Sequence, residues 1–168
     1  RGWDHILFVL ALFFLSPKLR PLLVQAGTFT VAHTATLALG TLGIVTLTPA
    51  VTEPLVAAAI VYAGISNIFA RQLHADRILL VFAFGLLHGL TFASGLAEAG
   101  MVEGQALMSL LGFNTGVELG QLAMITAAWL TLGLRFNGSL KYRGRVAIPA
   151  SVTIAAIGGW WFVERVFL

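Results

Sequence analysis

FNTGVELGQ, residues 113–121, is a polar stretch inside an apolar run that extends from residue 105 to residue 134. Asn114, Glu118 and Gln121 are spaced at i, i+4 and i+7, so a helix places all three on one face. An ionised carboxylate inside a bilayer costs roughly 2.5–3.5 kcal/mol on insertion scales and therefore needs a partner or a function. The stretch predicts a membrane helix with a polar stripe toward the protein interior, which serves either a functional site or a structural hydrogen-bond network.

A second pattern in this run is a glycine at every fourth position, at Gly112, Gly116 and Gly120. Small residues at this spacing allow another helix to approach closely. The pattern predicts a tightly packed helix, and the partner helix belongs either to the same chain or to a second copy in a homo-oligomer.

The composition indicates an integral membrane protein. Of 168 residues, 58% are hydrophobic and only 10% are charged, with a mean hydropathy of +0.93, whereas soluble domains carry about 25% charged residues. The chain has no cysteine, which excludes disulfides, thiolate metal sites and cysteine nucleophiles. The net charge of +3 comes from basic residues in connecting segments, so it indicates a lipid bilayer and no nucleic acid as the partner.

Apolar runs of about 20 residues cross a bilayer as helices. The sequence predicts six such helices, at residues 2–15, 22–47, 54–70, 78–97, 105–134 and 146–167. Pro54 is expected in the first turn of the third helix, where proline is tolerated. We therefore expect an all-α, polytopic membrane protein with a six-transmembrane-helix bundle that forms one domain over residues 1–168.

The charges of the connecting segments predict the orientation. The first, third and fifth connectors carry eight basic residues, namely Lys18, Arg20, Arg71, Arg77, Arg135, Lys141, Arg143 and Arg145. The second and fourth connectors carry none and contain Glu53, Glu98 and Glu103 instead. By the positive-inside rule, the basic connectors face the cytoplasm. Both termini then lie outside the cytoplasm, in a multi-pass protein of the bacterial inner (cytoplasmic) membrane.

Three ionisable side chains are predicted at one depth. His33, His88 and Glu118 each lie about ten to thirteen residues into their helices, which at 1.5 Å per residue is near the middle of a 30 Å hydrocarbon layer. Asp4 and His5 begin the first helix at the outer side. Imidazole and carboxylate ligands suit divalent nickel, cobalt, zinc or copper better than magnesium or calcium.

Each of these polar residues also has a structural interpretation. A single histidine on an apolar helix is usually a hydrogen-bonded structural residue, and we interpret His74 in the third connector in this way. Asn67, near the inner end of the third helix, is either a helix-packing hydrogen bonder or a late ligand on an exit path. For His33 and His88, the shared depth with Glu118 favours a functional site.

Four motifs in this chain resemble those of the HupE/UreJ family of membrane proteins. They are GWDHILF (residues 2–8), FTVAHTATL (residues 29–37), FGLLHGLTFA (residues 84–93) and FNTGVELGQ (residues 113–121). Glu53 and Asn67 lie where the family has a glutamate and an asparagine in its third helix. The resemblance covers most of the chain through Gln121, in the same order, and the last helix carries little of it.

The resemblance implies a nickel or cobalt transporter, of a kind often associated with hydrogenase or urease maturation or with cobalt uptake. It assigns metal handling to Asp4, His5, His33, His88 and Glu118, with Asn114, Asn67 and Glu53 as further candidate ligands. The family's first helix usually has another histidine upstream of the Asp-His pair. This sequence starts with Arg1, so we expect that histidine, or a leader, to precede it.

The leading hypothesis is therefore a permease, not an enzyme, that carries a divalent transition-metal ion. The ion is captured at Asp4 and His5, passes to His33, His88 and Glu118, and leaves past Asn67. One alternative is an intramembrane zinc-dependent hydrolase, although no His-Glu-x-x-His motif is present. The other is a haem-binding membrane subunit with His33 and His88 as axial ligands.

Overall fold

The computed structural model describes residues 2–16, 18–70, 73, 75–98, 106–136 and 142–168. Its elements are α1 (Gly2–Leu15), α2 (Leu19–Thr41), α3 (Pro49–Phe69), α4 (Ala75–Glu98), α5 (Ala106–Ala128), the π-helical turn η1 (Trp129–Gly133), α6 (Leu134–Phe136), the π-helical turn η2 (Arg143–Ala147) and α7 (Ile148–Phe167). Five residues named above, Arg1, Arg71, His74, Glu103 and Lys141, lie outside the described residues.

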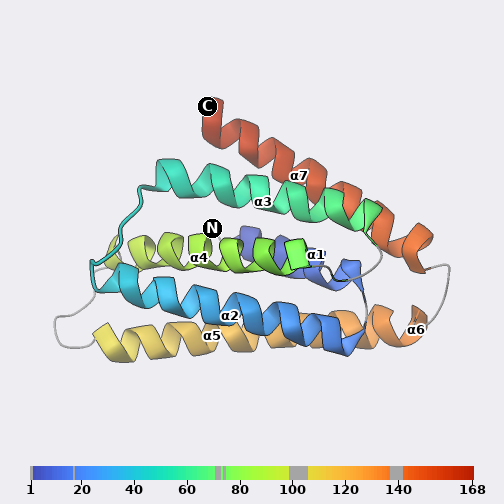
Figure 1. The fold of residues 1–168 in the computed structure, drawn as a ribbon, viewed down its shortest axis with the longest axis horizontal. Coiled ribbons are helices and arrows are strands. Elements are labelled where there is room, and N and C mark those ends of the chain that lie inside the picture. Colours follow the sequence, from blue (N-terminus) through green and yellow to red (C-terminus); the bar gives the residue numbers. More distant parts are fainter. Residues whose placement is uncertain (1, 17, 71–72, 74, 99–105, 137–141) are drawn as a thin grey trace.

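The described part of the chain forms six helical segments and contains no strand, so the all-α prediction is confirmed. In two of the segments, η1 and α6 continue α5, and η2 leads into α7. Successive segments run in opposite directions along the long axis of the bundle (Figure 1). We call the end where α3 begins and α2, α4 and α7 finish the Glu53 end, and we call the opposite end the Arg77 end.

Four of the described helical segments are long and apolar enough to cross a membrane. They span Leu19–Thr41, Pro49–Phe69, Ala75–Gly95 and Arg143–Phe167. The apolar helix α1 has 14 residues, about 21 Å at 1.5 Å per residue, and is shorter than a hydrocarbon layer of about 30 Å. These spans support a membrane protein, while the number of six spans and the side of the termini stay predictions.

The third helix begins earlier than predicted. Pro49, not Pro54, occupies its first turn, preceded by Thr48 in an extended conformation. Proline suits a first turn because the amide that it lacks has no partner there. Pro54 lies inside α3, so the sequence interpretation was wrong, because the connection from α2 already ends at Thr48 and Pro49 supplies the proline of the first turn. The preceding helix, α2, correspondingly ends at Thr41 instead of residue 47.

The helix α1 is short but central. Nine of its 14 residues are buried, including Phe8, Leu12 and Phe13. It contacts α2, α3, α5 and α7, so it fills the middle of the bundle. Its first turn therefore lies among the other helices, close to the middle of α4.

Two parallel helices, α2 and α4, pack against each other along their length (Figure 1). Their backbones approach closely at two glycines of α4. A Cβ atom added to Gly85 would lie 2.8 Å from the carbonyl oxygen of Phe29, and one added to Gly89 would overlap the carbonyl oxygen of His33 and the hydroxyl of Thr36. The pairing depends on these glycines because any side chain there would separate the helices.

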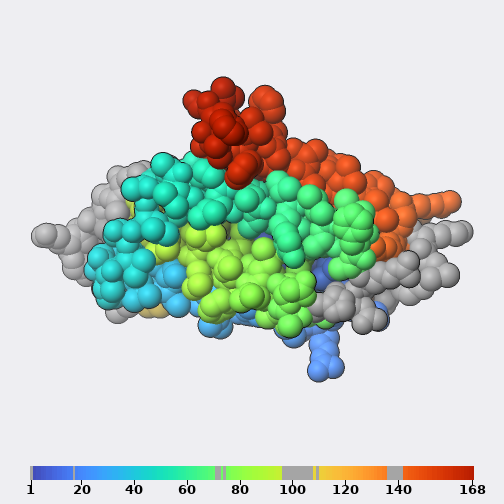
Figure 2. Space-filling model, turned by 45° about the horizontal axis from the view of Figure 1, so that its top comes forward, coloured from blue at the N-terminus to red at the C-terminus, as the bar shows by residue number. Residues whose placement is uncertain are grey.

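The helices α3 and α7 form a second closely packed pair, with antiparallel directions. Gly64 of α3 faces the backbone of Ser151 in α7, and Gly158 of α7 faces Val61 in α3. The last turns of α7 stand out from the surface formed by α3 and α4 (Figure 2), and Phe167 there is largely exposed.

The glycines of α5 do not make the close helix contact that the sequence predicted. A Cβ atom added to Gly112, Gly116 or Gly120 would meet no described atom within 4 Å. Gly116 and Gly120 instead line an open groove of about 330 Å³ between α5, α1 and α4. The prediction was wrong for packing within the described chain, because close packing uses the glycines of α3, α4 and α7. A homo-oligomer stays a prediction.

Candidate metal site

The structure brings together three histidines from three helices. His5 in α1 stacks on His88 in α4, with ring centroids 5.2 Å apart and planes inclined by 30°. His33 in α2 lies 6.4 Å from His88 between ring centroids. At most 8% of each residue is exposed. We call these three residues the histidine cluster.

The position of His5 differs from the sequence prediction. His5 was expected near the outer surface, above a deeper site formed by His33 and His88. Because α1 is buried and short, its first turn lies level with the middle of α4, so His5 joins the same cluster. Its neighbour Asp4 points away from His5, toward α7, as adjacent residues on a helix diverge by about 100°.

Phenyl rings surround the histidine cluster. Phe84 stacks on His88 at 4.9 Å, and Phe92 meets the same imidazole edge-on at 5.0 Å. Phe29 lies 5.1 Å from His5 and 5.4 Å from His33 between ring centroids. These contacts cover most of the imidazole surface, in agreement with the low exposure of the three histidines.

Five imidazole nitrogens in this cluster have no hydrogen-bond partner. They are both ring nitrogens of His5, both ring nitrogens of His88, and Nε2 of His33. A buried polar group without a partner costs about 1–3 kcal/mol. Aromatic side chains of similar size would fill the same space without this cost. The arrangement therefore suits a ligand that accepts electron pairs from imidazole, such as a transition-metal ion.

Asn114 determines which nitrogen of His33 is available. Its side-chain Oδ1 lies 3.3 Å from Nδ1 of His33 and also accepts a hydrogen bond from Thr34 Oγ1 at 3.1 Å. An amide oxygen can only accept, so Nδ1 carries the proton and Nε2 presents its lone pair to the cluster. A hydrogen bond to the non-ligating nitrogen is the usual way in which proteins orient a metal-binding histidine. Asn114 thus lies where it can position His33.

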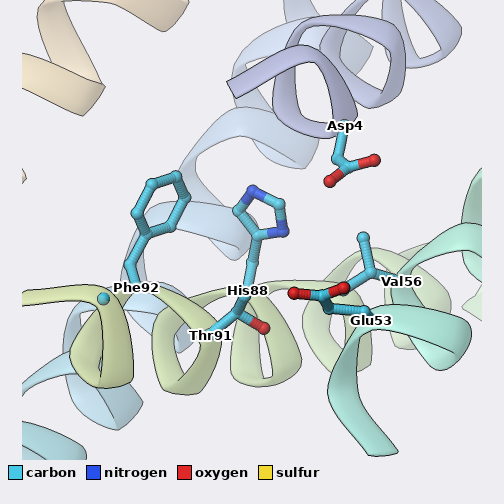
Figure 3. Close-up of a pocket in the computed structure, with 7 residues that line it drawn as sticks. Asp4, Glu53, Val56, His88, Thr91 and Phe92 are labelled. Atoms are coloured by element: carbon cyan, nitrogen blue, oxygen red, sulfur yellow. The ribbon is translucent and has the colours of Figure 1, made fainter. Parts of the chain in front are cut away.

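A small cavity connects His88 with two carboxylate side chains. It has a volume of about 40 Å³ and is lined by Asp4, Glu53, His88 and four further residues, Val56, Thr91, Phe92 and Gly95. Figure 3 shows the Asp4 and Glu53 carboxylates and the His88 imidazole around this space, each from a different helix. A volume of this size accommodates an ion or a few water molecules.

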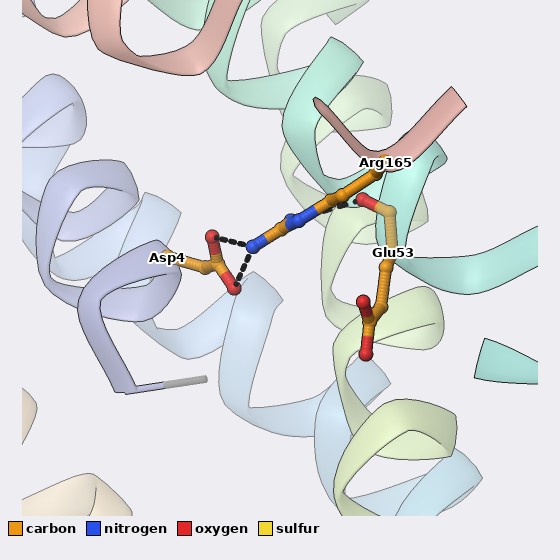
Figure 4. A network of polar contacts seen from close by, with 3 residues as sticks. All are labelled: Asp4, Glu53 and Arg165. Atoms are coloured by element: carbon orange, nitrogen blue, oxygen red, sulfur yellow. Dashed lines mark hydrogen bonds and ion pairs between the residues drawn. The ribbon is translucent and has the colours of Figure 1, made fainter. Parts of the chain in front are cut away.

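Asp4 already has a cationic partner. Arg165 Nη2 donates to both carboxylate oxygens of Asp4, at 2.9 and 3.0 Å, and Nη1 donates to the backbone oxygen of Glu53 at 3.0 Å. The guanidinium also lies 5.4 Å from the ring centroid of Trp161. Arg165 therefore joins α7 to the beginnings of α1 and α3 (Figure 4).

Glu118 does not join the histidine cluster. It is exposed and lines a separate cavity of about 180 Å³ between α2 and α5, together with Thr30 and Gln121. It lies one helical turn from Asn114, displaced toward the Arg77 end. The structure therefore does not bring Glu118 together with His33 and His88 in one cavity.

Asn67 lies at the Arg77 end of the bundle, in a polar network. Its Nδ2 donates to the backbone oxygen of Ala11 at 2.8 Å and to Ser151 Oγ at 3.2 Å, while its Oδ1 has no partner. Arg77 is 4% exposed and donates to the same Ala11 oxygen, at 3.2 Å. This network closes the bundle between the histidine cluster and the Arg77 end.

Among the residues that the structure describes, no three histidine or acidic side chains are close enough to hold one ion together. Metal–nitrogen bonds of about 2.1 Å place two ligating nitrogens roughly 3 Å apart. The ring centroids of the histidine cluster, at 5.2 and 6.4 Å, indicate a loose arrangement that would have to contract around an ion.

Two arginines in these networks were not predicted as parts of a site. Arg77 was assigned to a cytoplasmic connector, and only the three-dimensional structure shows that its side chain turns inward. The sequence alone could have marked Arg165 as unusual. It is a basic residue at a helix end where the other charges of the chain predict an acidic surface. Such a violation of the charge pattern indicates an internal partner.

A model of the HupE/UreJ protein family matches residues 1–165, and the chain belongs to this family. The resemblance seen in the sequence motifs is thereby confirmed. The family is associated with nickel and cobalt transport. No curated protein matches the chain significantly, and no solved structure does.

Proposed function

We propose that this chain is a permease that carries nickel or cobalt ions across the bacterial cytoplasmic membrane as a single helical domain, residues 1–168. The family membership supports metal transport, and the apolar helices support a location in the bilayer. The basic connectors support an orientation with the Arg77 end in the cytoplasm and both termini outside.

The observation that carries this proposal is the set of five unpartnered imidazole nitrogens in the histidine cluster. Imidazole is a ligand of borderline softness that suits nickel and cobalt, and equally zinc and copper. Three histidines from α1, α2 and α4 would bind the ion when the cluster contracts. Asn114 would hold His33 in the required tautomer.

The positions of the acidic residues suggest a route. The ion would enter at the Glu53 end, through the cavity lined by Asp4 and Glu53, which opens onto His88. It would pass to His33 and then to Glu118, which lies one turn further toward the Arg77 end. Release past Asn67 would require the Arg77 network to open, because that network separates the cluster from this end.

The packing disfavours a haem between His33 and His88. The helices that carry them are in backbone contact at Gly89, and the two imidazole centroids are only 6.4 Å apart. A porphyrin between two axial ligands would need the helices to separate. A zinc hydrolase is disfavoured by the family, which is of a transporter type.

The test is metal content of detergent-purified protein after loading with Ni²⁺ or Co²⁺ and removal of free ion. We expect bound metal in the wild type and its loss in the His33→Ala/His88→Ala double variant. His74→Ala is the matched control, because the sequence places this histidine in a polar connector. Normal metal uptake by cells that express the double variant would reject the proposal.

A further inference from the structure

We propose that Arg165 is a tethered competitor of the transported ion: its guanidinium occupies Asp4 while the site is empty, and a divalent ion that binds between Asp4 and His88 displaces it. This inference rests on the proposed function and adds a residue that determines affinity and selectivity. Neither the sequence motifs nor the family resemblance above assigns a role to Arg165.

The geometry places Arg165 on the ligand atoms that an entering ion would need. One nitrogen, Nη2, is within 3.0 Å of both carboxylate oxygens of Asp4. The same carboxylate lines the cavity that contains His88. The side chains of Asp4 and Arg165 are 8% and 18% exposed, so the pair is largely shielded from water. An ion that reaches this cavity therefore meets a carboxylate that is already neutralised.

The ion pair between Arg165 and Asp4 lowers the energetic cost of the buried carboxylate when no metal ion is bound. An uncompensated carboxylate among apolar helices is costly, and Arg165 compensates it when no ion is bound. Binding then becomes an exchange of one cation for another. The entering ion must gain more from Asp4 and His88 than Arg165 loses at Asp4, at the backbone oxygen of Glu53 and at the Trp161 ring.

This exchange favours divalent ions that also bind imidazole. A monovalent ion replaces the guanidinium without a gain in charge, and Mg²⁺ or Ca²⁺ gains little from nitrogen ligands. Ni²⁺ and Co²⁺ gain from both the second charge and the nitrogens of His88. Arg165 thus raises the binding free energy that an ion must supply in order to displace the guanidinium from Asp4.

The position of Arg165 allows it to leave. It lies in the last turn of α7, whose final residues stand out from the bundle (Figure 2). After displacement the guanidinium can reach water without movement of the histidine cluster. Its departure would also remove the cation from the face of Trp161, which provides a spectroscopic signal.

The experiment measures the dissociation constant for Co²⁺ by calorimetry in the wild type and in Arg165→Gln, Asp4→Asn and the corresponding double variant. We expect Arg165→Gln to bind Co²⁺ roughly tenfold more tightly, the scale of one charge-assisted hydrogen bond. Asp4→Asn should bind more weakly, and in that background Arg165→Gln should bring no tightening. Arg145→Gln, an exposed residue at the Arg77 end, is the matched control.

Outcomes separate this inference from the proposed function. If the wild type binds no metal, both are rejected. If it binds metal but Arg165→Gln has an unchanged or weaker affinity, only the competition is rejected, and Arg165 is a positioning residue for Asp4. Thermal unfolding and elution profiles show whether each variant is folded.

A second measurement covers the case in which Arg165→Gln does not fold. Zn²⁺, which has a filled d shell, is titrated into the wild-type protein while tryptophan emission is recorded. We expect a change that Trp161→Phe abolishes and Trp160→Phe retains. Binding of Zn²⁺ by calorimetry without this change in emission would overturn the inference.

Discussion

The imidazole rings of His5 and His88 stack with their centroids 5.2 Å apart, although one lies in the first turns of α1 and the other in the middle of α4. Neither ring has a hydrogen-bond partner for either nitrogen. Stacked, buried and unpartnered imidazoles are a poor arrangement for stability alone. Reduced stability at this place is what the binding role proposed above would require.

The first prediction is that replacing His88 changes stability and metal binding in opposite directions. We expect His88→Leu to stabilise the metal-free protein by about 1 kcal/mol, because a buried polar group without a partner is removed. The same variant should lose metal binding. Thermal unfolding and metal content of the purified protein measure the two effects.

Phe84→Leu is the control for this prediction. Phe84 stacks on the same imidazole at 4.9 Å and is fully buried, but it has no polar atom. It should lose about 1 kcal/mol of stability through poorer packing. A metal-free His88→Leu protein that unfolds more easily than the wild type would show that His88 has a structural role.

The second prediction concerns Asn114 as a positioning residue. We expect Asn114→Leu to weaken Co²⁺ binding by roughly 10–100-fold, the usual effect of losing the partner of a metal-binding histidine. Asn114→Asp should retain most of the affinity, because a carboxylate also accepts a hydrogen bond from Nδ1–H of His33. Titration calorimetry provides the comparison, with Thr115→Ala, an exposed neighbour, as the control. Equal affinities in the leucine and aspartate variants would contradict this role.

The third prediction distinguishes two sets of glycines. Gly89→Ala should destabilise the protein by about 1–3 kcal/mol, because the added methyl group overlaps the backbone of His33. Gly116→Ala should be neutral or slightly stabilising, because its added methyl group meets open space and alanine favours a helix. Thermal unfolding of both purified variants tests the difference. A strong loss with Gly116→Ala would instead indicate that the α5 groove is occupied, for example by a second copy of the chain.

The fourth prediction separates binding from transport at Glu118. Since Glu118 lies one turn beyond His33 in a different cavity, Glu118→Gln should retain metal binding by the purified protein but slow uptake into proteoliposomes by at least roughly tenfold. Glu164→Gln, at an exposed carboxylate of α7, serves as the control. If Glu118→Gln loses the bound metal itself, Glu118 belongs to the primary site and the structure describes a conformation in which it is withdrawn.

The helices and the positions of His33 and His88 could be predicted because apolar length and polar interruptions are local properties of a sequence. Depth was less reliable: counting residues from the predicted helix starts gave Glu118 the same depth as His33 and His88, but α2 and α4 begin three residues before their predicted starts of 22 and 78, at Leu19 and Ala75. His5 could not be assigned to the cluster because the sequence does not show that α1 occupies the centre of the bundle.

The sequence also did not predict which neighbouring helix each side chain contacts. The stripe of Asn114, Glu118 and Gln121 was correctly placed on one face of a helix, yet only Asn114 reaches a histidine. The glycine repeat of α5 indicated a close contact that the described chain makes elsewhere, at Gly85 and Gly89. Both outcomes depend on which helix lies opposite, and spacing within one helix does not contain that information.

The backbone contact between α2 and α4 has a mechanical consequence. The close approach of α2 and α4 at Gly85 and Gly89 leaves little space in which the two helices could slide past each other, so we expect them to move together. The backbones at His33 and His88 would then keep their separation, so contraction of the histidine cluster around an ion would come from side-chain rotation and from movement of α1, which carries His5. If the chain transports metal as proposed, alternating access to the two membrane faces would come from rocking of α1 or α5, which carry His5, Asn114 and Glu118, against this helix pair.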